Sequence, residues 1–251
     1  MRISVVVPFY NEEEGIPHLR KKLKQLAQAL PASDELECVL VDDGSTDNSA
    51  QVARECFEQM SGVIYAVHPQ NRGLGAAMRT GFTQATGDVI CAIDSDCTYD
   101  PLKIPLLLDA LAMSGADIAA GSPYHPEGGV ENVIGWRLFL SRAASWMYRF
   151  VCPSKLFTYT SMMRAYRRKV IEVVPFSSDG FAGVTEILLR ASQQGFRITE
   201  VPMVLHSRVV GTSKMKVMRS IAMHLQLMFQ AFIWRFKGAA PRPVVNAKEI
   251  G

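Results

Sequence analysis

Short apolar runs alternate with amphipathic stretches through the first half of the chain. The apolar runs predict β-strands at Ile3–Val7, Leu36–Val41, Val63–Val67, Val89–Ile93 and Ile118–Ala120. Apolar residues at helical spacing predict helices between them, at Glu14–Leu30, Asp47–Met60, Ala76–Ala85 and Leu102–Met113. Runs without strict alternation, separated by helices, are typical of parallel strands buried on both faces. The pattern therefore predicts an α/β fold with a mostly parallel open sheet and helices on both faces.

The pattern changes after Gly121. The segment Pro123–Gly129 is rich in turn-forming residues and predicts a loop. Further along, the sequence predicts helices at Trp136–Val151, Phe181–Gln194 and Met215–Phe236, and strands at Ser161–Tyr166 and Ile198–Leu205. The tail 238–251, rich in Ala and Pro, is predicted to be disordered.

Charge is distributed unevenly over the 251 residues. Residues 1–131 contain nine Lys and Arg against nineteen Asp and Glu, a net charge of −10, whereas residues 132–251 contain eighteen against five, a net charge of +13. Two stretches, 132–171 and 201–248, contain no acidic residue. The acidic half suits a metal ion. The basic half suits a polyanion such as a diphosphate, a lipid phosphate, an anionic membrane or a nucleic acid, unless it is simply a solvated face.

The cysteines and the N-terminus indicate the cellular compartment. Five cysteines are scattered without a CxxC pair or a metal-ligand spacing: Cys38, Cys56, Cys91, Cys97 and Cys152. This usage is typical of reduced thiols in a cytosolic protein. The apolar run Ile3–Val7 is too short for a signal peptide and is followed by Pro8 and then by acidic residues.

Polar motifs follow the first three predicted strands: PFYNE at residues 8–12, VDDGSTD at 41–47 and NRGLG at 71–75. Ligands of doubly wound sheets lie beyond the carboxyl ends of the strands. Asp42 and Asp43 could accept hydrogen bonds from a base or a ribose, and the backbone N–H groups of NRGLG could meet an anion or a base edge. Each motif by itself is equally compatible with a turn that begins a helix.

The fourth strand-end motif is Asp94-Ser95-Asp96. Two carboxylates on either side of one residue can both point their oxygens at one hard cation. Mg²⁺ or Mn²⁺ held in this way keeps positions open for substrate phosphates and can neutralise a leaving diphosphate. Asp-X-Asp is common and mostly structural, but its place at the end of the fourth strand of such a sheet predicts a metal site at Asp94 and Asp96.

The motifs taken in order resemble family 2 glycosyltransferases, and within them the dolichyl- and polyprenyl-phosphate mannosyltransferases. The resemblance rests on PFYNE, VDDGSTD, NRGLGAA, DSD, GSPY, SMMRAYRR, TEILLRASQQGFRITEVP and HSRVVGTSK, from Ile3 to Lys214. It implies a GT-A catalytic domain over residues 1–214 and a nucleotide-diphosphate sugar donor such as GDP-mannose or a UDP-sugar. It further implies Mg²⁺ or Mn²⁺, transfer with inversion, and a polyprenyl- or dolichyl-phosphate acceptor.

The resemblance also assigns roles by position. It implies that the base and ribose are held by five residues: Pro8, Tyr10, Glu12, Val41 and Asp43. It places the metal and the sugar diphosphate at Asp94, Ser95 and Asp96. It implies that Arg208 and Lys214 clamp the donor phosphates from a mobile loop. Arg137 and Ser141 match positions that contact the acceptor phosphate, although a plain helix face is an equal interpretation of that pair.

Two positions depart from the family pattern. The family often has Gln two residues after the second metal-site Asp, and Thr98 stands there. The family also has Arg in a GSRY-like segment, where this chain has Pro123. The first change leaves two carboxylates and water for the metal. The second removes an expected phosphate cation and leaves the acceptor and the sugar open.

Glu186 bears on the choice of acceptor. A saccharide hydroxyl needs a general base, and Glu186 is the acid best placed for that role by motif position. A lipid phosphate is already ionised at neutral pH and needs no strong base. Glu186 could instead be a structural carboxylate paired with Arg190 four residues later.

The segment 215–237 predicts an amphipathic helix at a membrane surface. Its longest uncharged stretch, Ser220–Trp234, falls short of the roughly 20 apolar residues of a membrane span, so none is predicted. Apolar residues recur on one side of the helix: Met218, Ile221, Ala222, Leu225, Met228, Phe229, Phe232, Ile233 and Phe236. Basic residues flank them, which favours peripheral binding to the anionic cytoplasmic face of a membrane. A helix packed on the sheet, or a dimer contact, is the alternative.

Other functions fit the sequence less well. A nucleotidyltransferase should have a basic Gly-rich loop after the first strand, where PFYNE is acidic. An NAD-dependent oxidoreductase should have GxGxxG there. Nucleic-acid binding lacks an evident pattern of interleaved aromatic residues. A membrane-associated nucleotide-sugar-binding protein without catalysis stays open because of Thr98 and Pro123.

Overall fold

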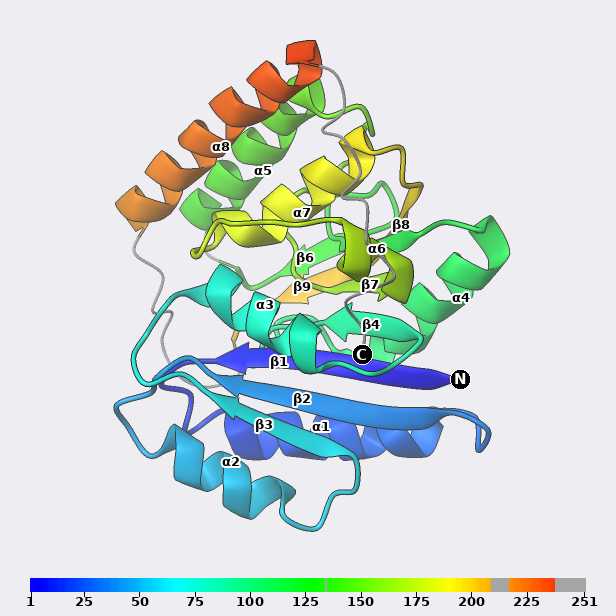
Figure 1. Cartoon of the computed structure of the whole chain (residues 1–251), viewed down its shortest axis with the longest axis vertical. Coiled ribbons are helices and arrows are strands. Elements are labelled where there is room, and N and C mark those ends of the chain that lie inside the picture. The colour runs from blue at the N-terminus through cyan, green and yellow to red at the C-terminus, as the bar shows by residue number, and fades with distance from the viewer. Residues whose placement is uncertain (134, 209–216, 238–251) are drawn as a thin grey trace, which may run out of the picture.

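The computed structural model describes residues 1–133, 135–208 and 217–237. A seven-stranded sheet in the order β3-β2-β1-β4-β7-β5-β8 crosses the molecule (Figure 1). Its strands are β1 (Arg2–Phe9), β2 (Glu35–Asp42), β3 (Val63–Val67), β4 (Val89–Ala92), β5 (Ile118–Ser122), β7 (Arg164–Arg167) and β8 (Ile198–Pro202). Neighbouring strands are parallel except at β7, which is antiparallel to β4 and β5. The predicted mostly parallel α/β sheet is confirmed.

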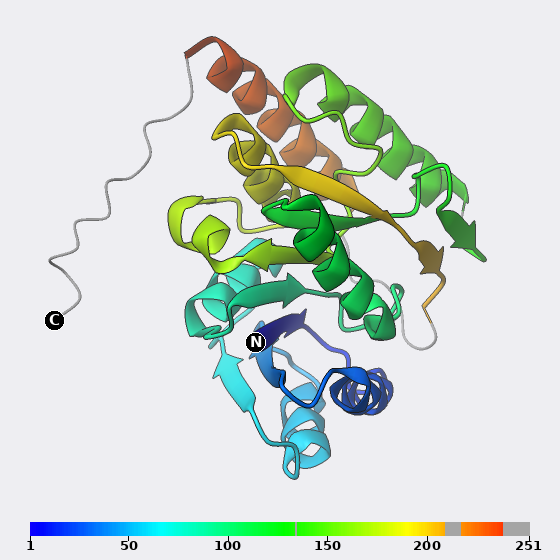
Figure 2. The same cartoon turned by 90° about the vertical axis from the view of Figure 1, so that its right-hand side faces the viewer.

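Helices cover both faces of this sheet (Figures 1 and 2). One face packs against α1 (Ile16–Ala29), α2 (Ser49–Phe57) and α4 (Ile104–Ser114), which follows the short 3-10 helix η1 (Pro101–Lys103). The other packs against α3 (Leu74–Gln84), α5 (Gly135–Val151), α6 (Arg168–Val173), α7 (Ala182–Gln193) and α8 (Val217–Lys237). In β1, Val5 and Val7 belong to the first core and Val6 to the second. Burial on both faces explains why the strand sequences do not alternate.

One predicted strand, Ile198–Leu205, is wrong as a single element. It is split between β8 of the main sheet and β9 (Val204–His206), which pairs with β6 (Gly129–Glu131) in a separate two-stranded sheet. Pro202 has no backbone N–H with which to continue a ladder. Met203 then bonds to the carbonyl of Ser122 and to the N–H of Gly129, and the chain passes to β6. Neither β6, α6 nor the antiparallel direction of β7 was predicted.

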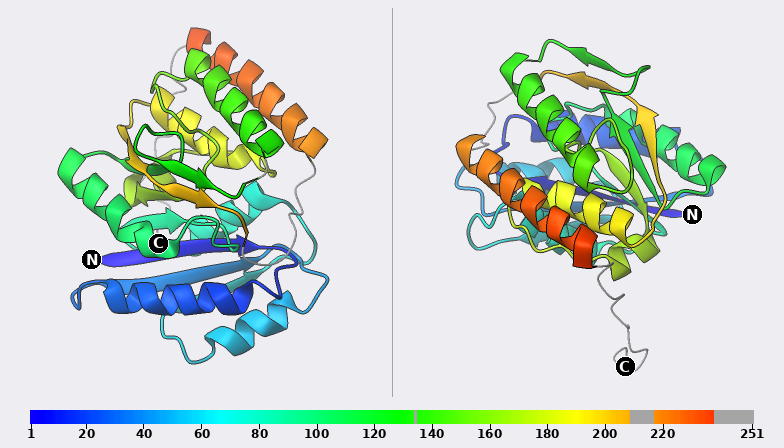
Figure 3. Two further views of the ribbon diagram at one scale, coloured as in Figure 1. Left: turned by 180° about the vertical axis from the view of Figure 1, so that it is seen from behind. Right: turned by 90° about the horizontal axis from the view of Figure 1, so that it is seen from above.

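The helices α5 and α8 lie side by side on the outer part of the second layer (Figures 1 and 3). The hydroxyl of Tyr148 on α5 lies 2.9 Å from Nδ1 of His224 on α8, and Leu227 and Ala231 bury the inner side of α8. Thus α8 is packed on the domain, but it also keeps large apolar side chains exposed. Among the described residues, no helix is long and apolar enough to cross a lipid bilayer.

Candidate active site

The strand order creates a switch point between β1 and β4, because the chain winds outward to β2 and β3 before it returns to β4. Ligands of doubly wound sheets bind at such a point, beyond the carboxyl ends of the strands. In the β1–β2 register Pro8 pairs with Val41 and Phe9 with Asp42. The sheet therefore brings the first two predicted motifs together at the same edge, with the DSD motif on the other side of β1.

Three of the predicted site residues meet at this edge. The Nη1 atom of Arg208 lies 2.8 Å from Oε1 of Glu12, and its Nε lies 2.7 Å from Oδ2 of Asp96. Both carboxylate side chains are 8% exposed and that of Arg208 is 26% exposed. Arg208 reaches them because the N–H of His206, at the end of β9, bonds to the carbonyl of Thr98 in the DSD loop. The guanidinium thus bridges acids that follow β1 and β4.

Burial and neighbouring carboxylates disfavour the charged form of Asp94. Burial, the Asp96 carboxylate and the Glu12 carboxylate raise the pKa of Asp94 to about 7, while Arg208 and Arg164 act in the opposite direction. Arg164 is fully buried on β7, opposite Ala92 of β4, and its guanidinium donates to the carbonyls of Tyr159 and Val184. Burial, followed by the two neighbouring acids, thus outweighs the two neighbouring cations in setting the pKa of Asp94.

The carboxylates of this cluster fit a hard divalent ion that takes only one or two of its ligands from the protein. Within the described residues, no group of three or more His, Cys, Asp or Glu side chains is arranged to hold a metal. Mg²⁺ is typically bound by one or two carboxylates together with substrate phosphates and water. Asp94 and Asp96 match that requirement, and the Arg208 guanidinium already marks a place where this edge attracts a cation.

The turns after β1 and β2 are joined to each other. The N–H of Asn11 bonds to Oγ of Ser45 at 3.0 Å, and the N–H of Thr46 bonds to Oδ1 of Asn11 at 2.8 Å. Asn11 has a φ of 53°, which an Asn tolerates better than most residues. The N–H of Glu12 bonds to Oγ of Ser49 at 2.7 Å. These bonds fix the backbone that carries half-buried Tyr10 and buried Glu12 at the rim of the site.

Asp43 is held by the protein itself. Its carboxylate accepts the N–H groups of Arg72 and Gly73 at 2.9 and 2.7 Å, and its Oδ1 lies 2.7 Å from Nδ1 of His68. The other ring nitrogen of His68 lies 2.8 Å from Oγ1 of Thr80. His68 was not predicted as a site residue, although its position just after β3 was the available signal. Asp43 therefore positions the NRGLG turn in this structure, whatever it contacts when a donor is bound.

The NRGLG segment is not an open anion site. Besides the two amides taken by Asp43, the N–H groups of Gly75 and Ala76 bond to the carbonyl of Asp179. The expectation that these N–H groups are available to an anion or a base is therefore wrong. Gly73, with a φ of 99°, and Gly75 allow the backbone of residues 178–180 to approach this closely.

Glu186 lies on α7 and contacts the segment before this helix and Arg190 on its next turn. Its side chain is 1% exposed and accepts the N–H groups of Ser177 and Ser178 at 3.1 and 2.8 Å, while Nε of Arg190 lies 2.6 Å away. Burial opposes ionisation, but the bonds from Ser178 and Arg190 outweigh it and lower the pKa of Glu186 below its usual value. These contacts favour the structural carboxylate that the sequence left as an alternative.

The residues matched to the acceptor phosphate lie on α5. Oγ of Ser141 lies 2.8 Å from Oγ1 of Thr160. The guanidinium of Arg137 lies over the ring of Trp136, and its buried Nε has no hydrogen-bond partner within the described residues. Such a buried donor is rare in native proteins unless a ligand or water completes it. Lys214 lies outside the described residues.

A doubly wound sheet with polar residues at its switch point defines a class of α/β proteins that bind ligands beyond the carboxyl ends of the strands. The sequence places the chain within that class: residues 4–174 match the model of the family described as glycosyl transferase family 2. The chain belongs to glycosyl transferase family 2.

Relatives and solved structures agree with this assignment. The chain is 32% identical to polyprenol monophosphomannose synthase of Mycolicibacterium smegmatis over 248 residues, 96% of this chain and 89% of that protein. It is 32% identical to dolichol-phosphate mannosyltransferase of Pyrococcus furiosus, covering 93% of this chain and 64% of that relative's length. Its fold is similar to that of glucosyl-3-phosphoglycerate synthase from Mycobacterium tuberculosis, solved with Mn²⁺, UDP and glucosyl-3-phosphoglycerate. That likeness has a TM-score of 0.69 at 20% identity and covers 96% of this chain and 81% of that one.

Proposed function

We propose that this chain transfers a sugar from a nucleotide-diphosphate donor to a polyprenyl- or dolichyl-phosphate acceptor at a membrane surface, with inversion at the anomeric carbon. The observation that carries the proposal is the cluster of Glu12, Asp96 and Arg208 at the switch point, beside the half-buried Asp94. The two curated relatives, whose names specify polyprenol and dolichol phosphate, support the lipid acceptor.

Asp94 and Asp96 would hold Mg²⁺ or Mn²⁺, with Ser95 close to the sugar diphosphate. The ion would supply positive charge to the diphosphate as the glycosidic bond breaks. Pro8, Tyr10, Glu12 and Val41 would line the base and ribose, because they lie at or just beyond the carboxyl ends of β1 and β2 at the same edge. Asp43 would act on the donor mainly by fixing the NRGLG turn.

Arg208 is proposed to clamp the donor phosphates. In the structure its guanidinium forms ion pairs with Glu12 and Asp96. When a metal-bound donor binds, the metal ion would bring a second positive charge close to these two acids. The side chain could then move from the carboxylates to the diphosphate and keep its charge compensated in both states. A phosphate contact that strengthens as the leaving group gains charge lowers the barrier more than it tightens donor binding. Lys214 is proposed for the same role.

The nature of the acceptor follows from the requirement for a base. A phosphate oxygen is ionised at neutral pH and can attack the anomeric carbon in line, so that positioning supplies most of the catalysis. A saccharide hydroxyl would have to lose a proton to a base, and Glu186 is engaged with two backbone N–H groups and with Arg190. The engagement of Glu186 favours the lipid phosphate over the hydroxyl. The Nε of Arg137, which has no hydrogen-bond partner among the described residues, supports a place for that phosphate beside α5.

Membrane attachment is proposed through α8, assisted by α5. Each helix exposes large apolar side chains, with Phe139, Trp146 and Phe150 on α5 and Met218, Leu225, Phe229 and Phe232 on α8. Exposed apolar patches on a paired set of helices are typical of interfacial binding when basic residues flank them. Because α5 and α8 are in contact, a membrane that binds one can reach the other. The proposed location is the cytoplasmic face.

A transfer screen tests the function directly. GDP- and UDP-sugars would be offered with Mn²⁺ or Mg²⁺, with and without polyprenyl phosphate, and both free nucleotide diphosphate and glycolipid would be measured. The proposal expects glycolipid from at least one donor and only slow hydrolysis without acceptor. Binding of a nucleotide-sugar without turnover under every condition would instead favour the non-catalytic alternative.

A further inference from the structure

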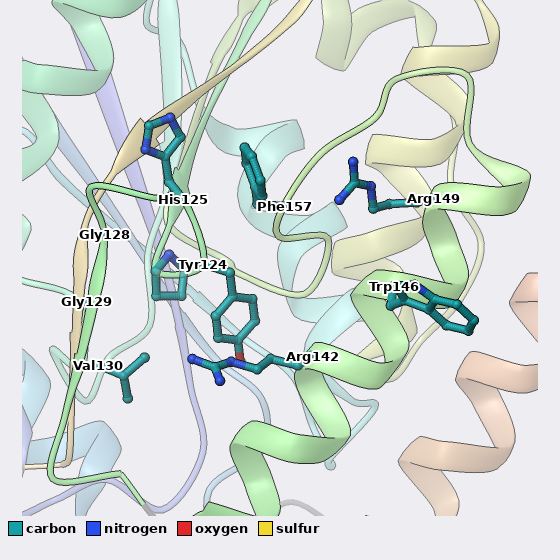
Figure 4. A pocket seen from close by; sticks show the side chains of 10 residues that line it. Tyr124, His125, Gly128, Gly129, Val130, Arg142, Trp146, Arg149 and Phe157 are labelled. Atoms are coloured by element: carbon teal, nitrogen blue, oxygen red, sulfur yellow. The ribbon is translucent and has the colours of Figure 1, made fainter.

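Two further cations, Arg142 and Arg149, lie on α5 outside the cluster of Glu12, Asp96 and Arg208. A pocket of about 300 Å³ opens between α5 and the segment 123–130 (Figure 4). The charged residues that line it are Arg142 and Arg149, with His125 opposite them, and no acidic residue lines it. Its remaining walls are aromatic and small: Pro123, Tyr124, Gly128, Gly129, Val130, Trp146 and Phe157.

The two arginines are held in place by aromatic rings. The guanidinium carbon of Arg142 lies 5.1 Å from the ring centre of Tyr124, and that of Arg149 lies 5.6 Å from the ring centre of Phe157. Figure 4 shows both side chains projecting from α5 toward the opposite wall. Stacking fixes the plane of a guanidinium and leaves its N–H edges available to an anion. Both residues are exposed and neither has a carboxylate partner among the described residues.

The pocket adjoins the proposed acceptor position, because Tyr124 in its wall lies within hydrogen-bonding reach of Ser141, but neither Ser141 nor Arg137 lines it. Arg142, Trp146 and Arg149 recur at the i, i+4 and i+7 spacing of one helix face. Ser141 is turned toward Thr160, and the Nε of Arg137 is buried. Its volume of about 300 Å³ is at the lower limit of small-molecule sites. Phe139 and Phe150, both exposed on α5, extend the apolar surface beside it.

We propose that the pocket between α5 and residues 123–130 binds the anionic headgroup of a membrane phospholipid, with Arg142 and Arg149 contacting the phosphodiester. The charge of the pocket, its aromatic walls and its place beside exposed apolar side chains fit a phosphate joined to acyl chains. The proposal deepens the membrane attachment within the proposed function and rests on it. A basic surface attracts an anionic membrane without selecting a particular lipid. The proposed pocket would in addition recognise the headgroup of one lipid molecule.

A lipid that forms no membrane separates these two effects. Dihexanoyl phosphatidylglycerol, kept below its micelle concentration, would be titrated into the full-length protein by calorimetry. Saturable binding is expected, and Arg142→Gln combined with Arg149→Gln should weaken it at least about tenfold, the loss expected for hydrogen bonds to a charged group. Arg219→Gln is the matched control, because it removes an exposed cation from α8 outside the pocket.

Flotation and kinetics complete the test. With phosphatidylglycerol vesicles, Arg219→Gln should lose the roughly fivefold of binding expected for one cation near an anionic surface. Arg142→Gln and Arg149→Gln, each made singly, should lose more than that. Transfer to a short-chain prenyl phosphate in detergent should keep its wild-type KM, which keeps the transferase proposal separate. Equal binding of dihexanoyl phosphatidylglycerol by the double variant overturns the pocket. Its displacement by prenyl phosphate, with a raised KM in the variant, reassigns the pocket to the acceptor.

Discussion

The acidic N-terminal part and the basic C-terminal part of this chain hold their charges in different ways. After β1 and β2 the key acids are buried and tied to the backbone, as Glu12 and Asp43 illustrate. On α5 the arginines Arg142 and Arg149 are exposed and stacked on rings, without carboxylate partners in the described part of the chain. A ligand that needs fixed geometry, such as the proposed nucleotide-sugar donor, should bind to the first region. A large, fluid and anionic ligand, such as the proposed membrane surface, should bind to the second.

Arg208 connects the two regions. It comes from the basic part, yet its guanidinium lies on Glu12 and Asp96 of the acidic part. Chemistry at the switch point should therefore depend on fixed acids and on cations from the C-terminal part, Arg208 and the proposed Lys214. The following experiments test the separate roles of the buried acids and the exposed cations, beginning with the largest expected effect.

Removing a fixed acid should abolish turnover. Asp94→Asn or Asp96→Asn deletes one of two carboxylates proposed for the metal, and we expect transfer to fall by at least about 10³-fold because leaving-group stabilisation is lost. Steady-state transfer with Mn²⁺ or Mg²⁺ measures this, and thermal unfolding checks the fold. Asp109→Asn, on an exposed position of α4, should behave as wild type. Near-normal activity of both site variants in the presence of EDTA would refute the metal site.

Removing the bridging cation should slow transfer without weakening metal binding. Arg208→Ala should lower kcat/KM by about 2–4 kcal/mol of transition-state stabilisation with a water-soluble short-chain acceptor. Because Arg208 pairs with Asp96, its loss should not raise the metal concentration needed for half-maximal activity. Arg219→Ala is the control for a lost cation. Wild-type kinetics from Arg208→Ala would rule out the clamp, and Lys214→Ala should act in the same direction as Arg208→Ala.

Charging the exposed side of α8 should detach the protein from vesicles. Phe229 and Phe232 are 66% and 50% exposed, so Phe229→Glu with Phe232→Glu should fold normally and still lose about 2 kcal/mol of interfacial binding. Flotation at several salt concentrations measures this, and salt should weaken the wild-type binding as well. Met113→Glu on α4 changes a side chain that is 89% exposed away from these helices and should float like wild type. Unchanged flotation of the double variant would mean that α8 is not the anchor.

Glu186 should influence stability more than chemistry. Its pKa is lowered in the folded state from an ordinary value of 4.5, so its stabilising contribution is present above that value and is lost as the pH falls through the folded-state pKa. Glu186→Gln should cost about 1–3 kcal/mol of unfolding free energy at pH 7, and the gap to wild type should narrow in acid. Denaturant unfolding from pH 7 to pH 3 measures this, with the exposed Glu172→Gln as control.

The kinetics of Glu186→Gln discriminate between acceptors. A general base contributes about 10²–10⁴-fold to the rate, so a loss of that size at neutral pH would restore the saccharide-hydroxyl alternative. With a lipid phosphate as acceptor, kcat should stay within a few-fold of wild type at a temperature where the variant is folded.

The local pattern of the chain was sufficient to predict most of the elements but not how they pair. The run Val63–Val67 was predicted with the bounds that β3 has, because a buried strand between turn residues is a local signal. The antiparallel direction of β7 was not predictable, since residue periodicity does not encode strand direction. Pro202 was a visible warning that Ile198–Leu205 could not be a single strand.

The site was predictable as a set of residues but not as a set of contacts. Order and spacing of the motifs selected Glu12, Asp94, Asp96 and Arg208. Nothing local indicates that Arg208 pairs with Glu12, because 196 positions separate them. The same limit explains why Asp43 was expected to face the donor, when the structure shows that His68 and two backbone amides hold it.

Gly75 has a consequence for how this chain can change over evolutionary time. Any side chain at this position would collide with the carbonyl oxygen of Ser178, and the Gly75 amide is bonded to the next carbonyl, that of Asp179. Gly75 thus permits a close backbone contact between the start of α3 and the segment that leads into α7. Substitutions should therefore be rare at Gly75 and common on the exposed surfaces of α5 and α8. The membrane-facing surface could then change while the contact between α3 and the segment before α7 stays the same.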